Sequence, residues 1–411
     1  MKLDPHKYRP DFPILAEKIH GKPLIYFDSA ASTQRPRQVM SAMTGLYEHA
    51  YANVHRGVHT LGDRATEAYE NARAKVQSFL GAAQPYEVLF TAGTTMAINL
   101  VARSWGDANI RAGDEILLLL SEHHSNIVPW QQLSARTGAA IKWINITPEG
   151  EFDWPDFQQK LTGKTKLVAF AAVSNVLGTI FPVERIIAAA HAAGAMTLVD
   201  AAQAAPHEKI DVQKWDADFV AFSGHKILGP TGIGVLYGKE KLLTEMPPFL
   251  GGGSMIDKVT LDGFTPGELP SKFEAGTPPI AEAVGLAAAI DYLTEIGMPQ
   301  IAVHERELAI KLHAALETIG DLQIYGPSPD KKAGIVSFNL NGIHAQDVGS
   351  LLDAKGVAIR VGHHCTMPLH HHLGASATCR ASLYLYNTAE ELDRFVEALT
   401  QVIAFFKNQR S

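Results

Sequence analysis

Two apolar runs of the chain end in side chains that suit the chemistry of an aldehyde cofactor. The run 195–200 ends at Asp200, and the run 219–222 is followed at once by a polar stretch that contains Lys226. A lysine amine can hold an aldehyde as a Schiff base. An aspartate can pair with a pyridine nitrogen and keep it protonated, so that the ring remains an electron sink. This combination fits pyridoxal 5'-phosphate.

A second group of polar residues, also next to apolar runs, could bind the rest of that cofactor. Thr94 and Thr95 follow a glycine and begin a predicted helix, whose first N–H groups and dipole favour a phosphate. Ser223 and His225 lie just before the lysine and are further candidates for phosphate ligands. His123 could stack on the face of the ring and also move protons.

Each of these features also has an ordinary structural explanation. An aspartate at the end of a strand is usually a cap or turn residue, and Gly-Thr-Thr suits the start of any helix. Their shared position at strand ends nevertheless favours one site, because ligands of open α/β sheets bind beyond the carboxyl ends of the strands.

The elements that must position these residues are strands and helices in alternation. From residue 87 onward, short runs rich in Val, Ile, Leu and Phe alternate with helical patterns, which predicts a wound α/β sheet, mostly parallel and covered on both faces. The expected strands span 87–91, 115–120, 140–146, 167–173, 195–200, 219–222 and 234–237, and the expected helices span 94–103, 126–137 and 183–193.

The last third of the chain changes character. Two long helical patterns, at 281–296 and 299–319, come before an α+β unit, and Thr388 should be the N-cap of a final amphipathic helix. Within that unit we expect strands at 335–340, 358–361 and 380–386, with a helix at 345–355. We therefore expect a large domain over residues 20–292 and a small α+β domain over residues 1–19 and 293–411.

Composition excludes several classes of function. The chain has 411 residues, 46% of them hydrophobic and 19% charged, which is enough for a large core. A net charge of -7 argues against binding nucleic acid through phosphate neutralisation. No apolar run approaches the about 20 residues of a membrane span, and the first residues do not resemble a secretory signal. With only Cys365 and Cys379, a reducing cytoplasm is the expected location.

Longer stretches of the chain carry a resemblance to a known group of enzymes. They include EHHSNIVPW (122–130), VDAAQAAPH (199–207), AFSGHKILGPTGIGVLYG (221–238), EAGTPP (274–279) and RVGHHCTMPL (360–369). On these motifs the chain resembles the cysteine desulfurases of the SufS/CsdA-like group, which are class-V aminotransferase-like enzymes of fold type I that use pyridoxal phosphate. The resemblance covers nearly the whole chain. It implies the same fold, with the cysteine at position 365 on a loop of the small domain.

The resemblance assigns contacts to positions of this chain. Ring contacts are implied for Lys226 as the Schiff-base lysine, Asp200 at the pyridinium nitrogen, Gln203 at the ring hydroxyl and His123 on the ring face. Phosphate contacts are implied for Thr95, Ser223 and His225, and for Thr277 of a neighbouring subunit, which implies a homodimer. Asn175 and Arg380 would bind the substrate carboxylate, and Arg360 and His55 would line the entrance.

The implied reaction converts L-cysteine to L-alanine through a ketimine of the cofactor. Cys365 would capture the sulfur as a persulfide, for transfer to a small acceptor protein of the SufE or SufU type and use in iron–sulfur cluster assembly. The GHHC setting of Cys365 is what separates desulfurases from related aminotransferases. Cys379 begins an apolar strand and is expected in the core. Met96 departs from the group, in which Glu is common at this position.

Alternatives remain open at this point. Another class-V enzyme, or a selenocysteine lyase acting on L-selenocysteine, would use the same lysine. Because selenium leaves more readily than sulfur, such a lyase need not depend on a cysteine nucleophile. Imidazole and thiol groups crowded within residues 363–372 could bind zinc, although their spacing matches no standard zinc framework. A non-catalytic sulfur-relay protein would leave the intact lysine constellation unexplained.

Overall fold

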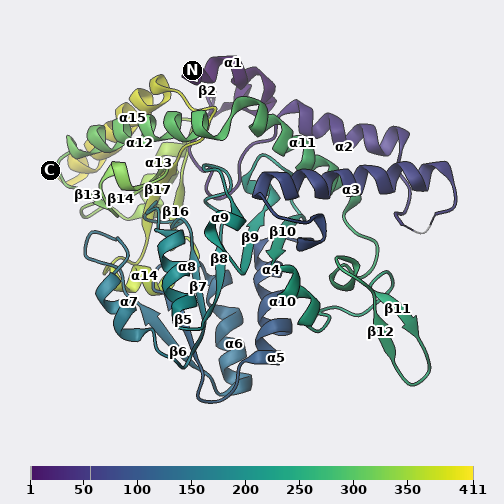
Figure 1. Ribbon diagram of the computed structural model, residues 1–411. Helices are drawn as coiled ribbons and strands as arrows, with labels where there is room; N and C mark the ends of the chain where they lie inside the picture. The colour runs from purple at the N-terminus through teal and green to yellow at the C-terminus, as the bar shows by residue number, and fades with distance from the viewer. Residues whose placement is uncertain (1, 56, 411) are drawn as a thin grey trace.

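The computed structural model describes residues 2–55 and 57–410, and its centre is a seven-stranded sheet (Figure 1). The strands lie in the order β4-β10-β9-β8-β7-β5-β6. Strands β5 to β9 run parallel, whereas β10 is antiparallel to both of its neighbours. The mostly parallel α/β sheet that the sequence predicts is therefore confirmed. The bounds are β4 (Val88–Thr91), β5 (Glu115–Leu119), β6 (Ala140–Ile144), β7 (Thr165–Ala171), β8 (Met196–Asp200), β9 (Phe219–Ser223) and β10 (Gly234–Gly238).

Alternate residues of each central strand enter two different cores, as the pleat of a strand requires. Val88 and Phe90 of β4 pack on one face of the sheet, whereas Leu89 packs on the other. Because both faces are buried, the strands appear in the sequence as continuous apolar runs. One face is covered by α2 (Arg37–His49), α3 (Thr60–Leu80), α8 (Val183–Ala192) and α11 (Ile280–Ile296), and the other by α4 (Thr94–Val101), α6 (Val128–Thr137) and α10 (Glu240–Glu245).

A four-stranded antiparallel sheet, in the order β13-β14-β17-β16, lies beside the first (Figure 1). It packs against α12, α13 and α15 around a core that includes Phe338 and Phe395. Thr388 accepts the N–H of Glu391 at 3.3 Å and donates its own N–H to the Glu391 carboxylate at 3.1 Å, which confirms the predicted cap of α15. The bounds are β13 (Leu322–Tyr325), β14 (Ile335–Leu340), β16 (Arg360–Gly362), β17 (Thr378–Ser382), α12 (Met298–Glu317), α13 (Ala345–Asp353) and α15 (Ala389–Arg410).

The remaining elements are short and lie mostly in connections. A hairpin, β11–β12, projects away from the body of the molecule (Figure 1). The bounds are α1 (Pro5–Tyr8), α5 (Asp107–Asn109), α7 (Trp154–Lys160), α9 (Val212–Trp215), α14 (Met367–His372), β1 (Lys18–Ile19), β2 (Lys22–Pro23), β3 (Ile25–Tyr26), β11 (Ile256–Val259), β12 (Phe264–Pro266) and β15 (Val357–Ala358). Across residues 2–55 and 57–410, the helices are too short or too polar to cross a membrane.

Two strand predictions are wrong by more than a shift of one or two residues at an end. The predicted strand 358–361 is two strands, because β15 pairs with β3 whereas β16 pairs with β17. The predicted strand 380–386 ends at Ser382, after which Leu383 donates its N–H to Gly334 outside the ladder. The residues beyond Ser382 are apolar because they are buried in the core, and not because they continue the strand.

The predicted boundary between domains, after residue 292, falls inside α11, which continues to Ile296. Helix α11 shares the core of the large sheet, whereas Leu308 and Leu312 of α12 belong to the core of the small sheet. The chain therefore passes from one sheet to the other close to this point. The division into residues 20–292 and residues 1–19 with 293–411 stays a prediction.

The small sheet is hydrogen-bonded to the loop that follows β7. Ser337 of β14 donates its hydroxyl to the carbonyl of Val176 at 2.6 Å, and the N–H of Ala333 donates to Gly178 at 2.9 Å. These bonds place Asn175, which lies in the same loop, between the two sheets.

Candidate active site

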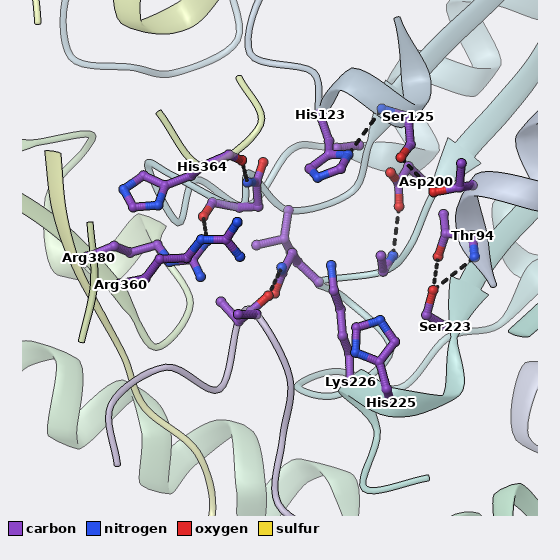
Figure 2. A pocket seen from close by; sticks show the side chains of 18 residues that line it. Thr94, His123, Ser125, Asp200, Ser223, His225, Lys226, Arg360, His364 and Arg380 are labelled. Carbon is purple, nitrogen blue, oxygen red and sulfur yellow. Dashed lines mark hydrogen bonds between the residues drawn. The ribbon is translucent and has the colours of Figure 1, made fainter. Parts of the chain in front are cut away.

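A cavity opens where the carboxyl ends of β7, β8 and β9 meet the start of α4 and the strands β16 and β17 (Figure 2). Its walls therefore come from both sheets. Most of the residues that the sequence predicts for the site line it: Thr94, Thr95, His123, Asn175, Asp200, Gln203, Ser223, His225, Lys226, Arg360 and Arg380. Their roles toward a ligand stay predictions.

Lys226 and Asp200 approach this cavity from neighbouring strand ends. Asp200, the last residue of β8, is buried, and its Oδ1 accepts the N–H of Ala202 at 2.9 Å. Burial raises the pKa of Asp200, although the charge of Lys226 acts to lower it. Burial lowers the pKa of Lys226 to about 8, although Asp200 acts to raise it. A large share of this amine is therefore neutral near pH 8, in the form that can condense with an aldehyde.

The start of α4 forms a corner of the cavity that is rich in hydroxyl groups (Figure 2). Thr94 donates its N–H to the Ser223 hydroxyl at 2.8 Å, and the hydroxyls of these two residues lie 2.7 Å apart. The hydroxyls of Thr95 and Ser125 also lie 2.7 Å apart. Burial and nearby cations lower the pKa of His225 to about 4, so that its ring is neutral. Hydroxyls and free N–H groups at a helix start suit a phosphate.

A close approach of two strands shapes this corner. Gly234, the first residue of β10, is opposite both Thr91 of β4 and Ser223 of β9. A Cβ atom at position 234 would lie 2.4 Å from the Cα of Gly93, which is closer than real Cβ atoms come. Glycine at position 234 is therefore what lets β10 lie against the turn that begins α4.

His123 enters the cavity with a neutral ring of defined tautomer (Figure 2). Its Nδ1 accepts the N–H of Ser125 at 3.1 Å, which places the ring proton on Nε2. Burial lowers the pKa of His123 to about 3, and the charge of Lys226 contributes in the same direction. The ring can therefore stack on a flat ligand or donate from Nε2 without carrying a charge.

Two arginines line the side of the cavity opposite the hydroxyl-rich corner at the start of α4 (Figure 2). Arg360 and Arg380 are direct partners across β16 and β17, where like charges repel. Arg380 is 1% exposed; it donates to the carbonyl of Asn175 at 2.9 Å and to Oδ1 of Asp28 at 3.1 Å. Its buried Nε finds no hydrogen-bond partner in the described chain. Burial lowers the pKa of Arg380 to about 10, with Arg360 contributing. This side of the cavity suits a carboxylate.

Asp28 is a residue beside the site that the sequence analysis missed. It follows β3 within the stretch YFDSAAST and forms the only acidic partner recorded for Arg380 in residues 2–55 and 57–410. Burial raises the pKa of Asp28, whereas Arg380 and Arg360 act to lower it. The signal that could have found Asp28 is a single acid in a run of apolar and small residues directly after a strand. Ser125 was also missed, although it lies in the polar stretch that follows the predicted strand 115–120.

Cys365 lies at the edge of the cavity. His364, directly before it, lines the cavity, and its carbonyl accepts the side-chain amide of Asn175 at 2.8 Å. The carbonyl of Cys365 accepts the backbone N–H of His124 at 2.7 Å, and the neighbouring His123 lines the cavity, so Cys365 borders the site. Cys365 is partly exposed. Cys379 is fully buried, and burial raises its pKa to about 12, so its predicted place in the core is confirmed.

Two of the predicted residues lie elsewhere in the single chain. His55 contacts the carboxylate of Glu70 at 2.9 Å and lines a second cavity, together with Gly276 and Pro278. Thr277 lies between these last two residues and is exposed. The geometry of one chain therefore does not bring His55 or Thr277 to the cavity of Lys226.

The crowded histidines do not form a metal site in the part of the chain that the structure describes, where no group of three His, Cys, Asp or Glu side chains is placed to hold an ion. His364 and His370 instead contact the hydroxyl of Thr378 through their Nε2 atoms, at 3.0 and 3.2 Å. His371 and His372 are exposed.

Comparisons with known proteins agree with this geometry. Residues 25–395 match the family model described as aminotransferase class-V. A probable cysteine desulfurase of Synechocystis sp. is 52% identical over 402 residues, which cover 97% of this chain and 96% of that one. The apo structure of a cysteine desulfurase from Thermococcus onnurineus NA1 superposes with a TM-score of 0.93, at 41% identity, over 98% of this chain and 99% of that one. The cysteine desulfurase CsdA from Escherichia coli has a TM-score of 0.91 at 37% identity, over 98% and 100% of the two chains.

Proposed function

The chain belongs to the class-V aminotransferase family, and from this premise we propose how its residues perform the desulfuration of L-cysteine. The protein is a cysteine desulfurase that depends on pyridoxal phosphate. When bound, this cofactor supplies the electron sink that eases loss of the α-proton and breakage of the bond between carbon and sulfur.

The residues of the cavity fit the cofactor. The side-chain oxygen of Gln203 is buried in the cavity wall and lacks a hydrogen-bond partner in the described chain, which suits a donor on the ring. Lys226 would hold the aldehyde, and Asp200 would pair with the ring nitrogen. The phosphate would bind the hydroxyl-rich corner of Thr94, Thr95 and Ser223, together with His225. His123 would stack on the ring.

The substrate would bind between this cofactor and the two arginines. Its carboxylate would receive hydrogen bonds from Arg380 and Arg360, with Asn175 beside them. Because Arg380 is already held by the carbonyl of Asn175 and by Asp28, its guanidinium is oriented before the substrate arrives. Lys226, with a pKa of about 8, is suited to take the α-proton on its Nζ once its amine is free.

Cys365 would then receive the sulfur. Its thiolate attacks the substrate sulfur and forms a bond between the two sulfurs, while the bond from that sulfur to carbon breaks. The electron pair of the broken bond remains with the carbon fragment, which takes up a proton and leaves as alanine. The observation that carries this proposal is that Asn175 and His364 line the cavity of Lys226 and are hydrogen-bonded to each other at 2.8 Å, which holds the residue next to Cys365 at the site.

Alanine formation from L-cysteine, with a reductant present, tests the assignment. Lys226→Ala and Cys365→Ala should both lose the activity, and only the cysteine variant should keep the yellow cofactor. Cys379→Ala is the matched control, since this second cysteine is buried in the core and should retain turnover. Full turnover of L-cysteine by Cys365→Ala would remove the persulfide step. Turnover of L-selenocysteine alone by that variant would indicate a lyase activity at the same site.

We propose that the enzyme works as a homodimer, because Thr277 and His55 lie outside their own chain's cavity. Large apolar side chains are exposed in the same region, with Val58 at 104% and Leu261, at the tip of the β11–β12 hairpin, at 106%. A free surface of this kind is typical of a partner interface. Sedimentation should show a dimer, and Thr277→Ala should weaken retention of the cofactor; a monomer with full activity would contradict this proposal.

We also propose that the persulfide passes to a small acceptor of the SufE or SufU type for iron–sulfur cluster assembly in the cytoplasm. The partly exposed thiol of Cys365 and the exposed Met367 beside it support such a transfer. Radioactive sulfur from L-cysteine should move from Cys365 to an added acceptor thiol. Label that stays on the enzyme with acceptors of both types would contradict the assignment.

A further inference from the structure

Two adjacent histidines face different partners on the segment after β5. His123 lines the cavity, whereas His124 contacts the loop that carries the nucleophile. The backbone N–H of His124 donates to the carbonyl of Cys365 at 2.7 Å. Its ring nitrogen Nε2 accepts the backbone N–H of Met367 at 3.0 Å. His124 is therefore bonded to the loop at Cys365 and again two residues later.

The segment that carries these histidines is itself held in place by hydrogen bonds among buried side chains. Glu122 is fully buried, and its carboxylate accepts the side-chain amide of Asn126 at 2.6 Å and the N–H of Ala171 at 2.8 Å. Asn126 in turn accepts the indole N–H of Trp130 at 2.8 Å. A bond from His124 to the loop is thus a bond to the rigid edge of the large sheet.

The loop needs external support because its backbone is strained. His364 and Cys365 are consecutive residues with φ values of 49° and 58°, in the left-handed region that side chains disfavour. Asn175 supports the carbonyl of His364. Thr366 is bonded within the loop, to the carbonyl of His363 at 2.8 Å, whereas Met367, the first residue of α14, donates its N–H outside the loop, to the ring of His124. This bond is exposed to solvent, so water can replace it when the ring is lost.

We propose that His124 is a positioning residue for sulfur transfer: its imidazole fixes the backbone after Cys365 and so keeps the thiol aimed at the cavity. This inference rests on the proposed function, in which Cys365 is the sulfur acceptor. His124 also links the Cys365 loop to the part of the cavity where the cofactor ring would lie, since His123 and His124 are neighbours on one fixed segment. Burial and the nearby His363 lower the pKa of His124, which keeps Nε2 free to accept.

Three substitutions separate this role from a structural one. His124→Gln places an amide oxygen close to the position of Nε2, whereas His124→Asn is too short and His124→Leu has no acceptor. His371→Leu is the control, since it removes an exposed histidine from α14, the helix that begins at Met367. The enzyme should be studied with its cofactor for turnover and without it for the reactivity of the thiol toward iodoacetamide. Cys379 is fully buried and should not contribute to the alkylation.

The Leu and Asn variants should alkylate at Cys365 about three- to tenfold faster than the wild type, because one hydrogen bond no longer restrains the loop. Their kcat for alanine formation should fall by a similar factor, with KM and the cofactor colour unchanged. The Gln variant should restore both values, and His371→Leu should change neither.

Equal behaviour of the Gln and Asn variants would overturn the proposal, even if the Leu variant does not fold. So would an alkylation rate in the Asn variant equal to that of the wild type. Failure of the proposed function is distinguishable from both results, because it would appear as turnover of L-cysteine without Cys365, whereas alkylation reports on the loop regardless of the reaction.

Discussion

A buried ion pair beneath the segment that carries Thr277 should dominate the stability of this part of the fold. Arg73 is 1% exposed, and its Nη1 and Nη2 donate to the two carboxylate oxygens of Glu274 at 2.8 Å each. The same carboxylate accepts the hydroxyl of Tyr69 at 2.9 Å and the N–H of Phe90 at 2.8 Å. All four bonds need an acceptor at position 274.

Glu274→Gln keeps the shape of this side chain but removes its charge, and it turns one acceptor into a donor that faces Arg73. Removing one partner of a buried ion pair costs about 3–5 kcal/mol, because the other charge stays buried. This loss changes the equilibrium constant of unfolding by about a hundredfold to a few thousandfold. Glu70 also contacts Arg73, at 2.9 Å, and it should limit the loss to the lower end of this range.

Urea unfolding followed by circular dichroism measures the effect, with Glu70→Gln as the matched variant. Glu70 contacts the same arginine but is 41% exposed, compared with 8% for Glu274. Its substitution should cost no more than about 1 kcal/mol, since solvent screens exposed pairs. Equal midpoints for Glu274→Gln and the wild type, or equal losses for the two variants, would show that burial does not set the strength of this pair.

Further predictions follow from the groups around the cavity. Burial lowers the pKa of His364 to about 2, below the value of about 6.5 in an unfolded chain, so the unfolded state binds a proton that the folded state does not. The free energy of unfolding should therefore be unaffected by this histidine above about pH 6.5 and should fall as the pH decreases, by about 2 kcal/mol at pH 5. When the urea midpoint is measured against pH, His364→Asn should flatten the profile in this range. The apoprotein should recapture its cofactor faster as the pH rises through about 8, where Lys226 loses its proton, and a rate independent of pH in absorbance measurements would contradict this. Arg380→Lys should raise KM for L-cysteine by about tenfold in steady-state assays, since lysine cannot bond to Asn175, Asp28 and a carboxylate in one plane. An unchanged KM would show that the substrate carboxylate binds elsewhere.

The parts of the site that the sequence predicts well are the ends of buried strands. Asp200 and Lys226 follow runs whose continuous apolar character defines both the strand and its end, and parallel strands bring such ends to one edge. Asp28 was not predicted, because its place depends on a pairing between the stretch after β3 and β17, which are far apart in the chain. The single acid directly after a strand marks Asp28 as a candidate, but this local pattern does not show that its partner is Arg380.

Extents and conformations were harder to predict than the existence of elements. Tyr384 and Tyr386 are fully buried, so their run is as apolar as a strand although the ladder has already ended. Helix α3 was not assigned, and the buried Arg73 interrupts the apolar stripe that would mark it. The left-handed backbone at His364 and Cys365 could not be predicted, since only a few per cent of residues other than glycine adopt it and no local pattern marks these two.

The glycine at position 234 has a consequence for redesign of the enzyme. The space for an anion beside Thr94 depends on β10, a strand that does not itself supply a ligand. Strand β10 can lie against Gly93 only because its first residue, Gly234, has no side chain. Even alanine there would press on the backbone of Gly93 and on the carbonyl of Phe222, each directly before a residue of the hydroxyl-rich corner. The geometry of the anion site is thus set from a strand behind it, and a redesign of that site must keep glycine at position 234.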